Sequence, residues 1–136
     1  LLVNNAGGGI SGAAEFTELS EAKGLFDVNF FGALNCVQAA LPLLREAEGS
    51  RIVNLSSVAA ALPIPFQAFY SASKAAINAL TLALANELRP FGVSVTALMP
   101  GDAATGFTAR VSAATSSTAD ASQSPLRGWN GTSGPA

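Results

Sequence analysis

The sequence predicts an α/β fold, a partial doubly wound parallel sheet in which three strands alternate with helices. Short apolar runs at 1–4, 51–55 and 93–99 are typical of buried strands. Longer apolar stretches at 20–46 and 69–88 separate them and are long enough for helices. Strands that alternate with helices are joined by right-handed crossovers, and such crossovers make the strands parallel.

Composition fits one globular domain within 136 residues, because 49% of the residues are hydrophobic and 12% are charged. A net charge of −2 gives no basic surface for nucleic acid or an anionic membrane. With no histidine and a single cysteine, a histidine-based triad or a metal site is not expected. Cys36 falls on an apolar stripe and is expected to be buried. No apolar run reaches membrane-spanning length, so the expected location is the cytoplasm.

The loop after the first strand contains a glycine pattern that suggests a dinucleotide fingerprint. Residues 7–12 have the spacing G-x-G-x-x-G, and Asp27 follows at about the right interval. That fingerprint also requires a helix that begins at the loop, but 13–21 has no convincing apolar period. A different role for these glycines is therefore favoured.

The first predicted helix contains one residue that is out of place. Ser20 is a suitable N-cap, and Pro42 is expected to bend the helix. Asn29 lies among apolar residues in the helix interior, where a buried amide requires hydrogen-bond partners. Asn29 is therefore either a functional residue or an amide satisfied by the backbone.

Two serines follow the second strand. In an open parallel sheet, ligands bind at the carboxyl ends of the strands, so Ser56 and Ser57 are well placed for chemistry. The two serines compete for this role, and the alternative for Ser56 is that it only forms the turn. Residues 59–67 contain two prolines and are expected to form a loop over the cleft.

Tyr70 and Lys74 form the central candidate pair. They lie four positions apart in the 69–88 helix and therefore project from the same face. A nearby ammonium favours the phenolate, so the tyrosine could act as a general acid or base. Ser57 could hold the oxygen of a carbonyl or alcohol beside the phenol. A chance solvated pair at helical spacing is the alternative.

The C-terminal part changes character. Residues 93–99 are followed by Pro100-Gly101, at the carboxyl end of the third strand. In the stretch 111–136, nineteen of 26 residues are Ser, Thr, Ala, Gly or Pro, which predicts a disordered tail after a domain at 1–110.

Taken together, these motifs resemble the short-chain dehydrogenase/reductase family over about residues 1–110. The resemblance rests on Val3-Asn4-Asn5-Ala6-Gly7, Asn29 in Asp-Val-Asn-Phe-Phe-Gly, Ser57, the Tyr70–Lys74 pair and Pro100-Gly101, in that order. It implies a Rossmann-like fold and a catalytic tetrad of Asn29, Ser57, Tyr70 and Lys74. In this family the asparagine holds a water that connects the lysine to solvent.

The same resemblance implies NAD or NADP as cofactor and a small-molecule alcohol or carbonyl as substrate. The expected cofactor contacts are Asn4, Ala6, Gly7, Tyr70, Lys74, Pro100, Gly101, Ala103 and Thr105. Asp102-Ala103 departs from the family, which often has an apolar residue followed by a branched one. A side chain at Asn5 that ties adjacent strands is a further expectation. Homo-oligomer contacts are expected through 20–46 and 69–89.

The chain is expected to be part of a longer protein. It opens inside a strand pattern, and its only methionine is Met99. The family's glycine-rich phosphate turn, and the residue that selects NAD or NADP, have no counterpart in the 136 residues. The alternative to an oxidoreductase is a catalytically inactive fragment or pseudoenzyme that acts only through association with other chains.

Overall fold

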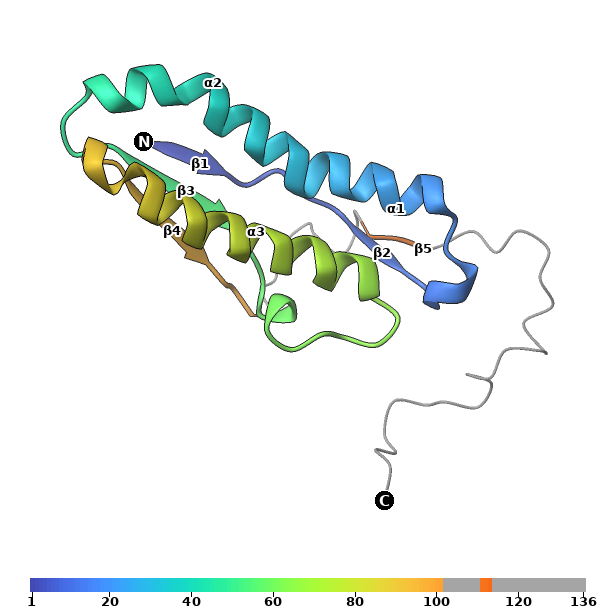
Figure 1. The fold of residues 1–136 in the computed structure, drawn as a ribbon. Coiled ribbons are helices and arrows are strands. Elements are labelled where there is room, and N and C mark those ends of the chain that lie inside the picture. The colour runs from blue at the N-terminus through green and yellow to red at the C-terminus, as the bar shows by residue number, and fades with distance from the viewer. Residues whose placement is uncertain (102–110, 114–136) are drawn as a thin grey trace.

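The computed structural model describes residues 1–101 and 111–113, in which strands alternate with helices along the chain (Figure 1). The strands are β1 (Leu2–Asn4), β2 (Gly9–Ser11), β3 (Arg51–Leu55), β4 (Ser94–Leu98) and β5 (Val111–Ala113). The helices are α1 (Leu19–Phe26), a π-helical turn (Asp27–Phe31), α2 (Gly32–Glu46) and α3 (Ala68–Leu88), with short 3-10 turns at Ala14–Phe16, Val58–Ala60 and Arg89–Phe91.

The main sheet has the order β1-β3-β4, and both pairings are parallel. Val53 is the partner of Val3 on one side and of Thr96 on the other. The long connections carry α1 with α2 and then α3 (Figure 1), as crossovers between parallel strands require. This arrangement confirms the predicted α/β class with its three-stranded parallel sheet.

A second, two-stranded sheet was not predicted. β2 pairs with β5 in parallel, and Ile10 is opposite Ser112. β5 lies at the start of the stretch for which composition predicts no regular structure; residues 114–136 are outside the described part of the chain. β2 follows the glycine loop directly, and the next long helix begins only at Leu19. The expectation that no helix begins at this loop is confirmed.

The main hydrophobic core lies between the sheet and the helices. Its buried residues are Val37 and Leu44 of α2, Ile52 of β3, Leu84 and Leu88 of α3, and Val93 before β4. Because both helices contribute, α2 and α3 cover the same face of the sheet (Figure 1). Each fully buried aliphatic side chain contributes about 1.5–3 kcal/mol to folding.

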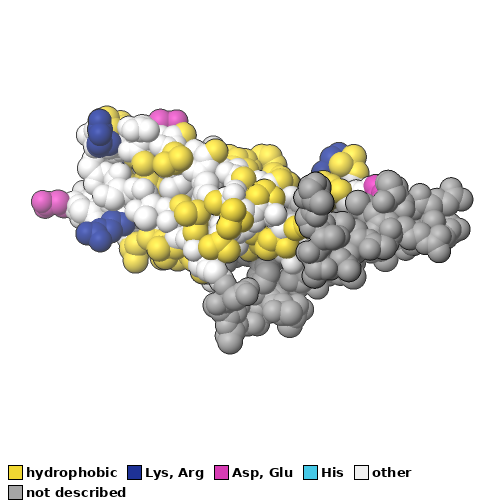
Figure 2. All heavy atoms as spheres, turned by 90° about the horizontal axis from the view of Figure 1, so that it is seen from below, with side chains coloured by type: hydrophobic (Ala, Val, Ile, Leu, Met, Phe, Trp, Pro, Cys, Tyr) yellow, Lys and Arg dark blue, Asp and Glu magenta, His cyan; other side chains and the backbone are white. Residues whose placement is uncertain are grey.

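The opposite face of the sheet is open within the described residues. Val3 and Leu98 point away from the helices and are 50% and 51% exposed. Figure 2, seen from below, shows hydrophobic side chains over a broad part of the surface, with charged side chains mainly toward its ends. Doubly wound sheets are ordinarily covered on both faces, so the described strands present apolar side chains that this kind of fold usually covers.

α1, the π-helical turn and α2 form one continuous helical stretch between β2 and β3 (Figure 1). The expected N-cap is wrong, because Ser20 lies inside α1 and Glu18 occupies the cap without a side-chain hydrogen bond. Pro42 is accommodated within α2.

Cys36 is exposed, which corrects the expected burial. The next residue, Val37, is buried and faces the sheet. Because an α-helix turns about 100° per residue, Cys36 points away from that face.

No helix in residues 1–101 combines the length and the apolar character needed to span a membrane.

Candidate active site

Lys74 is almost completely buried although it carries the only ammonium on α3. Its side chain is 5% exposed, and Nζ donates a hydrogen bond to the carbonyl of Leu55, at the end of β3, over 2.7 Å. Burial disfavours the charged form and lowers the pKa of Lys74 below its ordinary value of 10.5. The ammonium is thus fixed at the carboxyl end of the central strand.

Tyr70 lies one helical turn before Lys74 and is 8% exposed. Nζ of Lys74 is 5.9 Å from the centroid of the phenol ring, so the two groups face the same region, as their spacing predicts. The tyrosine packs against Ile10, Leu25 and Ala59, which fix the ring in an apolar setting.

Ser57 lies at the end of β3 and caps the 3-10 turn that follows. Its Oγ accepts a hydrogen bond from the Ala59 amide over 3.1 Å. This bond uses a lone pair, so the hydroxyl proton can still be donated to a substrate oxygen. Ser56 has a different role from the expected turn former, because its Oγ donates to the Lys74 carbonyl over 3.2 Å and joins β3 to α3.

Asn29 lies in the π-helical turn Asp27–Phe31 and is 2% exposed. Its Oδ1 accepts from the Gly8 amide over 2.9 Å, and its Nδ2 donates to the Gly8 carbonyl over 3.0 Å. The remaining N–H donates to Oγ of Ser73 over 3.0 Å. The buried amide is thus paired on both sides, and π-helical turns of this kind are frequent at functional sites.

Gly7 lies between the amide of Asn29 and the ammonium of Lys74. A Cβ at this position would lie 3.3 Å from Oδ1 of Asn29 and 3.4 Å from Nζ of Lys74. These distances leave little room for a side chain, so the Gly7 backbone comes close to an acceptor and to a cation at the same time.

Asn4 and Asn54 form a buried polar connection beneath this site. Nδ2 of Asn4 donates to Oδ1 of Asn54 over 2.8 Å, and Nδ2 of Asn54 donates to Oγ1 of Thr81 over 2.9 Å. The bonds join β1 to β3 and β3 to α3, the helix that carries Tyr70. The tie between strands predicted for Asn5 is thus made by Asn4, and Asn5 is exposed.

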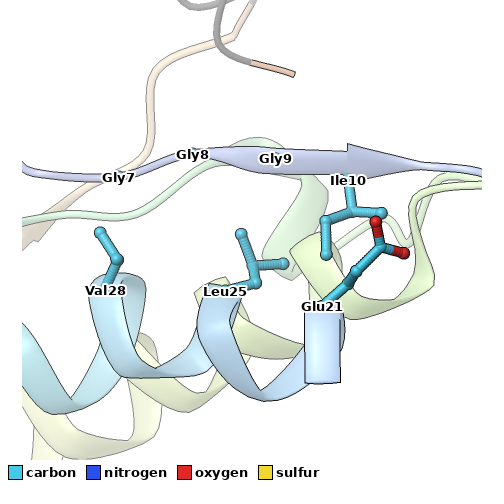
Figure 3. Close-up of a pocket in the computed structure, with 7 residues that line it drawn as sticks. All are labelled: Gly7, Gly8, Gly9, Ile10, Glu21, Leu25 and Val28. Carbon is cyan, nitrogen blue, oxygen red and sulfur yellow. The ribbon is translucent and has the colours of Figure 1, made fainter. Parts of the chain in front are cut away.

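A pocket of about 360 Å³ lies between the glycine loop and α1 (Figure 3). It is lined by Gly7, Gly8, Gly9, Ile10, Glu21, Leu25 and Val28. The figure shows the Glu21 carboxylate rising toward Ile10, with Leu25 and Val28 facing the glycine backbone. Ile10 connects this pocket to the site, because it lines the pocket and packs against Tyr70.

Residues 1–116 match the short chain dehydrogenase family. The chain belongs to this family. It is 45% identical over 108 residues to the 3-ketodihydrosphingosine reductase of Bacteroides thetaiotaomicron, covering 79% of this chain and 40% of that protein. It is 37% identical over 107 residues to retinol dehydrogenase 8 of Bos taurus, covering 79% of this chain and 34% of that protein. The chain thus spans well under half the length of these relatives.

Solved short chain dehydrogenase structures share the fold. The 3-ketoacyl-(acyl-carrier-protein) reductase from Brucella melitensis, complexed with NADH, matches with a TM-score of 0.76 and 34% identity over 81% of this chain and 48% of that chain. A gluconate 5-dehydrogenase from Burkholderia cenocepacia, in complex with NADP and tartrate, matches with a TM-score of 0.76 and 30% identity. The match covers 79% of this chain and 42% of that chain. The family resemblance found in the sequence is confirmed.

Of the remaining predicted positions, Ala6, Pro100 and Gly101 lie after the ends of β1 and β4. Ala6 is exposed between β1 and Gly7. Pro100 follows β4, and its carbonyl accepts from the Val58 amide, next to Ser57, over 3.2 Å. Gly101 is exposed beside it. Ala103 and Thr105 lie outside the described residues.

Two residues of the site were missed by sequence reasoning. Gly8 supplies both backbone partners of Asn29, and Ser73 supplies the third. The available signal was the position of Ser73, a polar residue directly before Lys74 in a helix that is mostly apolar.

Proposed function

We propose that this chain carries the proton-transfer part of an NAD- or NADP-dependent oxidoreductase that interconverts an alcohol and a carbonyl. The observation that carries the proposal is the joint burial of Tyr70 and Lys74, with Nζ held 5.9 Å from the ring centroid at the ends of the strands. Membership of the short chain dehydrogenase family supports it.

In alcohol oxidation, Tyr70 as phenolate accepts the hydroxyl proton while the C–O bond becomes a carbonyl. Ser57 donates its free O–H to the same oxygen and steadies it. A bound nicotinamide would supply the acceptor for the hydride that leaves the carbinol carbon, and this would balance the two electrons lost. In the reverse direction Tyr70 returns the proton as a general acid.

Lys74 has two roles in this proposal. Its Nζ lies near the phenol ring that exchanges the proton, and it would bind a ribose hydroxyl of the cofactor, as the family resemblance implies. Oδ1 of Asn29 has one lone pair beyond its bond to Gly8. A water held by this asparagine would connect Lys74 to solvent, as the family resemblance implies.

The residues present fit a nicotinamide cofactor. Gly7 and Gly8 offer a backbone without side chains beside a fixed ammonium, and a methyl group at Gly7 would crowd Asn29 and Lys74. The related structures from Brucella melitensis and Burkholderia cenocepacia contain NADH and NADP. For this chain NAD and NADP are equally acceptable candidates.

For the substrate we propose an apolar molecule with one oxygenated carbon. The sequence has no charged side chain between Arg51 and Lys74, the stretch that contains Ser57 and Tyr70. Within it, Val58, Leu62 and Ile64 are 43%, 74% and 42% exposed directly after Ser57.

The test of this function is a Tyr70→Phe change in a longer protein that contains this chain. Turnover of an apolar secondary alcohol should be lost while NADH binding, followed by fluorescence, is largely kept. Undiminished turnover by Tyr70→Phe refutes the proposed role. An apolar substrate is refuted if short polar alcohols are turned over with a higher kcat/KM than long-chain ones.

A second candidate is an inactive chain that acts through association. The open sheet face and an apolar groove of about 520 Å³ favour it. The groove is lined by Leu19, Ala22, Lys23, Phe26, Asp27, Phe31 and Phe69. These residues lie in the helical regions 20–46 and 69–89 or directly beside them, so self-association belongs to both candidates. NADH titration of the 136-residue chain and of a version extended upstream separates them, because binding by the extended form alone supports the enzyme.

A further inference from the structure

The hydroxyl of Ser73 is a fully buried polar group that the proposed mechanism leaves without a role. The side chain is 0% exposed and lies directly before Lys74 in α3. Serine inside a helix competes with the helical backbone for hydrogen bonds and has no intrinsic advantage there. A hydroxyl withdrawn from water must be paired to avoid a cost in free energy.

Both partners of Ser73 belong to the site. Oγ donates to the carbonyl of Tyr70 over 2.8 Å and accepts from Nδ2 of Asn29 over 3.0 Å. A hydroxyl has one proton, and here the Tyr70 carbonyl receives it. Ser73 therefore presents lone pairs to Asn29 and can bind only the NH₂ side of that amide.

The bonds form a continuous path from the glycine loop to the catalytic helix. Gly8 holds Asn29 through its amide and its carbonyl, Asn29 holds Ser73, and Ser73 holds the backbone of Tyr70. The path joins three segments that are distant in the sequence. It also fixes Oδ1 of Asn29 close to Gly7, which Nζ of Lys74 approaches as well.

We propose that Ser73 is a positioning residue that sets the first turn of α3 against the π-helical turn and the glycine loop. The proposal rests on the proposed function, because its purpose is to hold Tyr70 and Lys74 in place relative to Asn29. Without the hydroxyl, one buried N–H of Asn29 loses its acceptor and the side-chain path between the two helical segments is broken.

The first test is amide hydrogen exchange at Gly8 in the 136-residue chain, which needs no activity. Gly8 is not bonded to Ser73. A change at Ser73 can therefore alter exchange at the Gly8 amide only through the position of Asn29. We expect Ser73→Ala to speed exchange at Gly8 roughly tenfold, the equivalent of one hydrogen bond. Ser73→Thr, whose hydroxyl can make the same bond to a preceding carbonyl, should preserve protection.

The matched control is Ser71→Ala. Ser71 is a buried serine of the same helix, 4% exposed, and its hydroxyl accepts from the Ile64 amide over 3.2 Å. This change should reduce stability without altering exchange at Gly8. Equal acceleration in both alanine variants, or none in Ser73→Ala, overturns the proposal. If Ser73→Ala does not fold, loss of Gly8 protection in a folded Ser73→Thr variant overturns it instead.

The second test uses turnover by a longer protein that contains this chain. Ser73→Ala should lower kcat about tenfold with little change in the KM for substrate, and Ser73→Thr should restore it. A response at Gly8 with undiminished kcat overturns the positioning role. If Ser73→Ala speeds exchange at Gly8 but the unchanged longer protein shows no turnover, the proposed function is refuted. The hydrogen-bonded connection from Gly8 through Asn29 to Ser73 is then supported without a catalytic purpose.

Discussion

Replacement of Gly7 by alanine tests the close approach of Asn29 and Lys74. The new methyl would lie 3.3 Å from Oδ1 and 3.4 Å from Nζ, whereas a relaxed contact needs about 3.5–4.0 Å. Neither neighbour can move freely, because Oδ1 is bonded to Gly8 over 2.9 Å and Nζ to Leu55 over 2.7 Å. Crowding of this kind costs about 1–2 kcal/mol, offset by about 0.4–1 kcal/mol from the less flexible unfolded chain.

Gly24→Ala is the matched control for this substitution. Gly24 lies inside α1, and a Cβ there would have no neighbour within 4 Å, so the change should raise stability by about 0.5–1 kcal/mol. We expect the free energies of unfolding of the two variants to differ by about 1–2 kcal/mol, measured by urea denaturation with circular dichroism. Equal stabilisation of both variants would refute the close approach.

Three further changes test other parts of the structure. Burial lowers the pKa of Lys74 in the folded chain below 10.5, its value in the unfolded chain. Between these two pKa values the unfolded chain therefore binds more protons than the folded chain. Stability should therefore rise with pH through this alkaline window up to 10.5, and Lys74→Met should remove that part of the rise in Tm. Asn54→Ala leaves Asn4 and Thr81 without their partner and should cost about 1–3 kcal/mol in urea unfolding, against less than about 1 kcal/mol for the exposed Asn35→Ala. Cys36 is exposed, so a thiol reagent should modify it in the folded chain as fast as in urea; strong protection would contradict the described surface.

The regular elements could be predicted because each has a simple pattern. β3 occupies the predicted residues 51–55, and α3 begins one residue before the predicted helix and ends at the same residue, Leu88. Tyr70 and Lys74 could be paired from spacing alone, since helix geometry places residues four apart on one face. The family resemblance added Asn29 and Ser57, which lie far from this pair in the sequence.

The features that were missed depend on contacts between distant segments. β2 and β5 have three residues each and form a sheet only because residues 9–11 and 111–113 meet. Neither segment has the alternating pattern that identifies a strand on its own. Asn4 rather than Asn5 ties the strands because its side chain meets Asn54, a register that no local pattern reveals. The partners of Asn29 are likewise set by tertiary structure.

The π-helical turn also acts as a change of phase in the long helix. An α-helix advances about 100° per residue, so deletion of one residue within Asp27–Phe31 would rotate α1 by about that angle relative to α2. Ala22 and Leu25, the buried residues of α1, would then turn away from the protein interior, while Val37 and Leu44 of α2 stayed in the main core. The buried residues of α1 and of α2 therefore form two stripes whose offset is set by this single irregular turn.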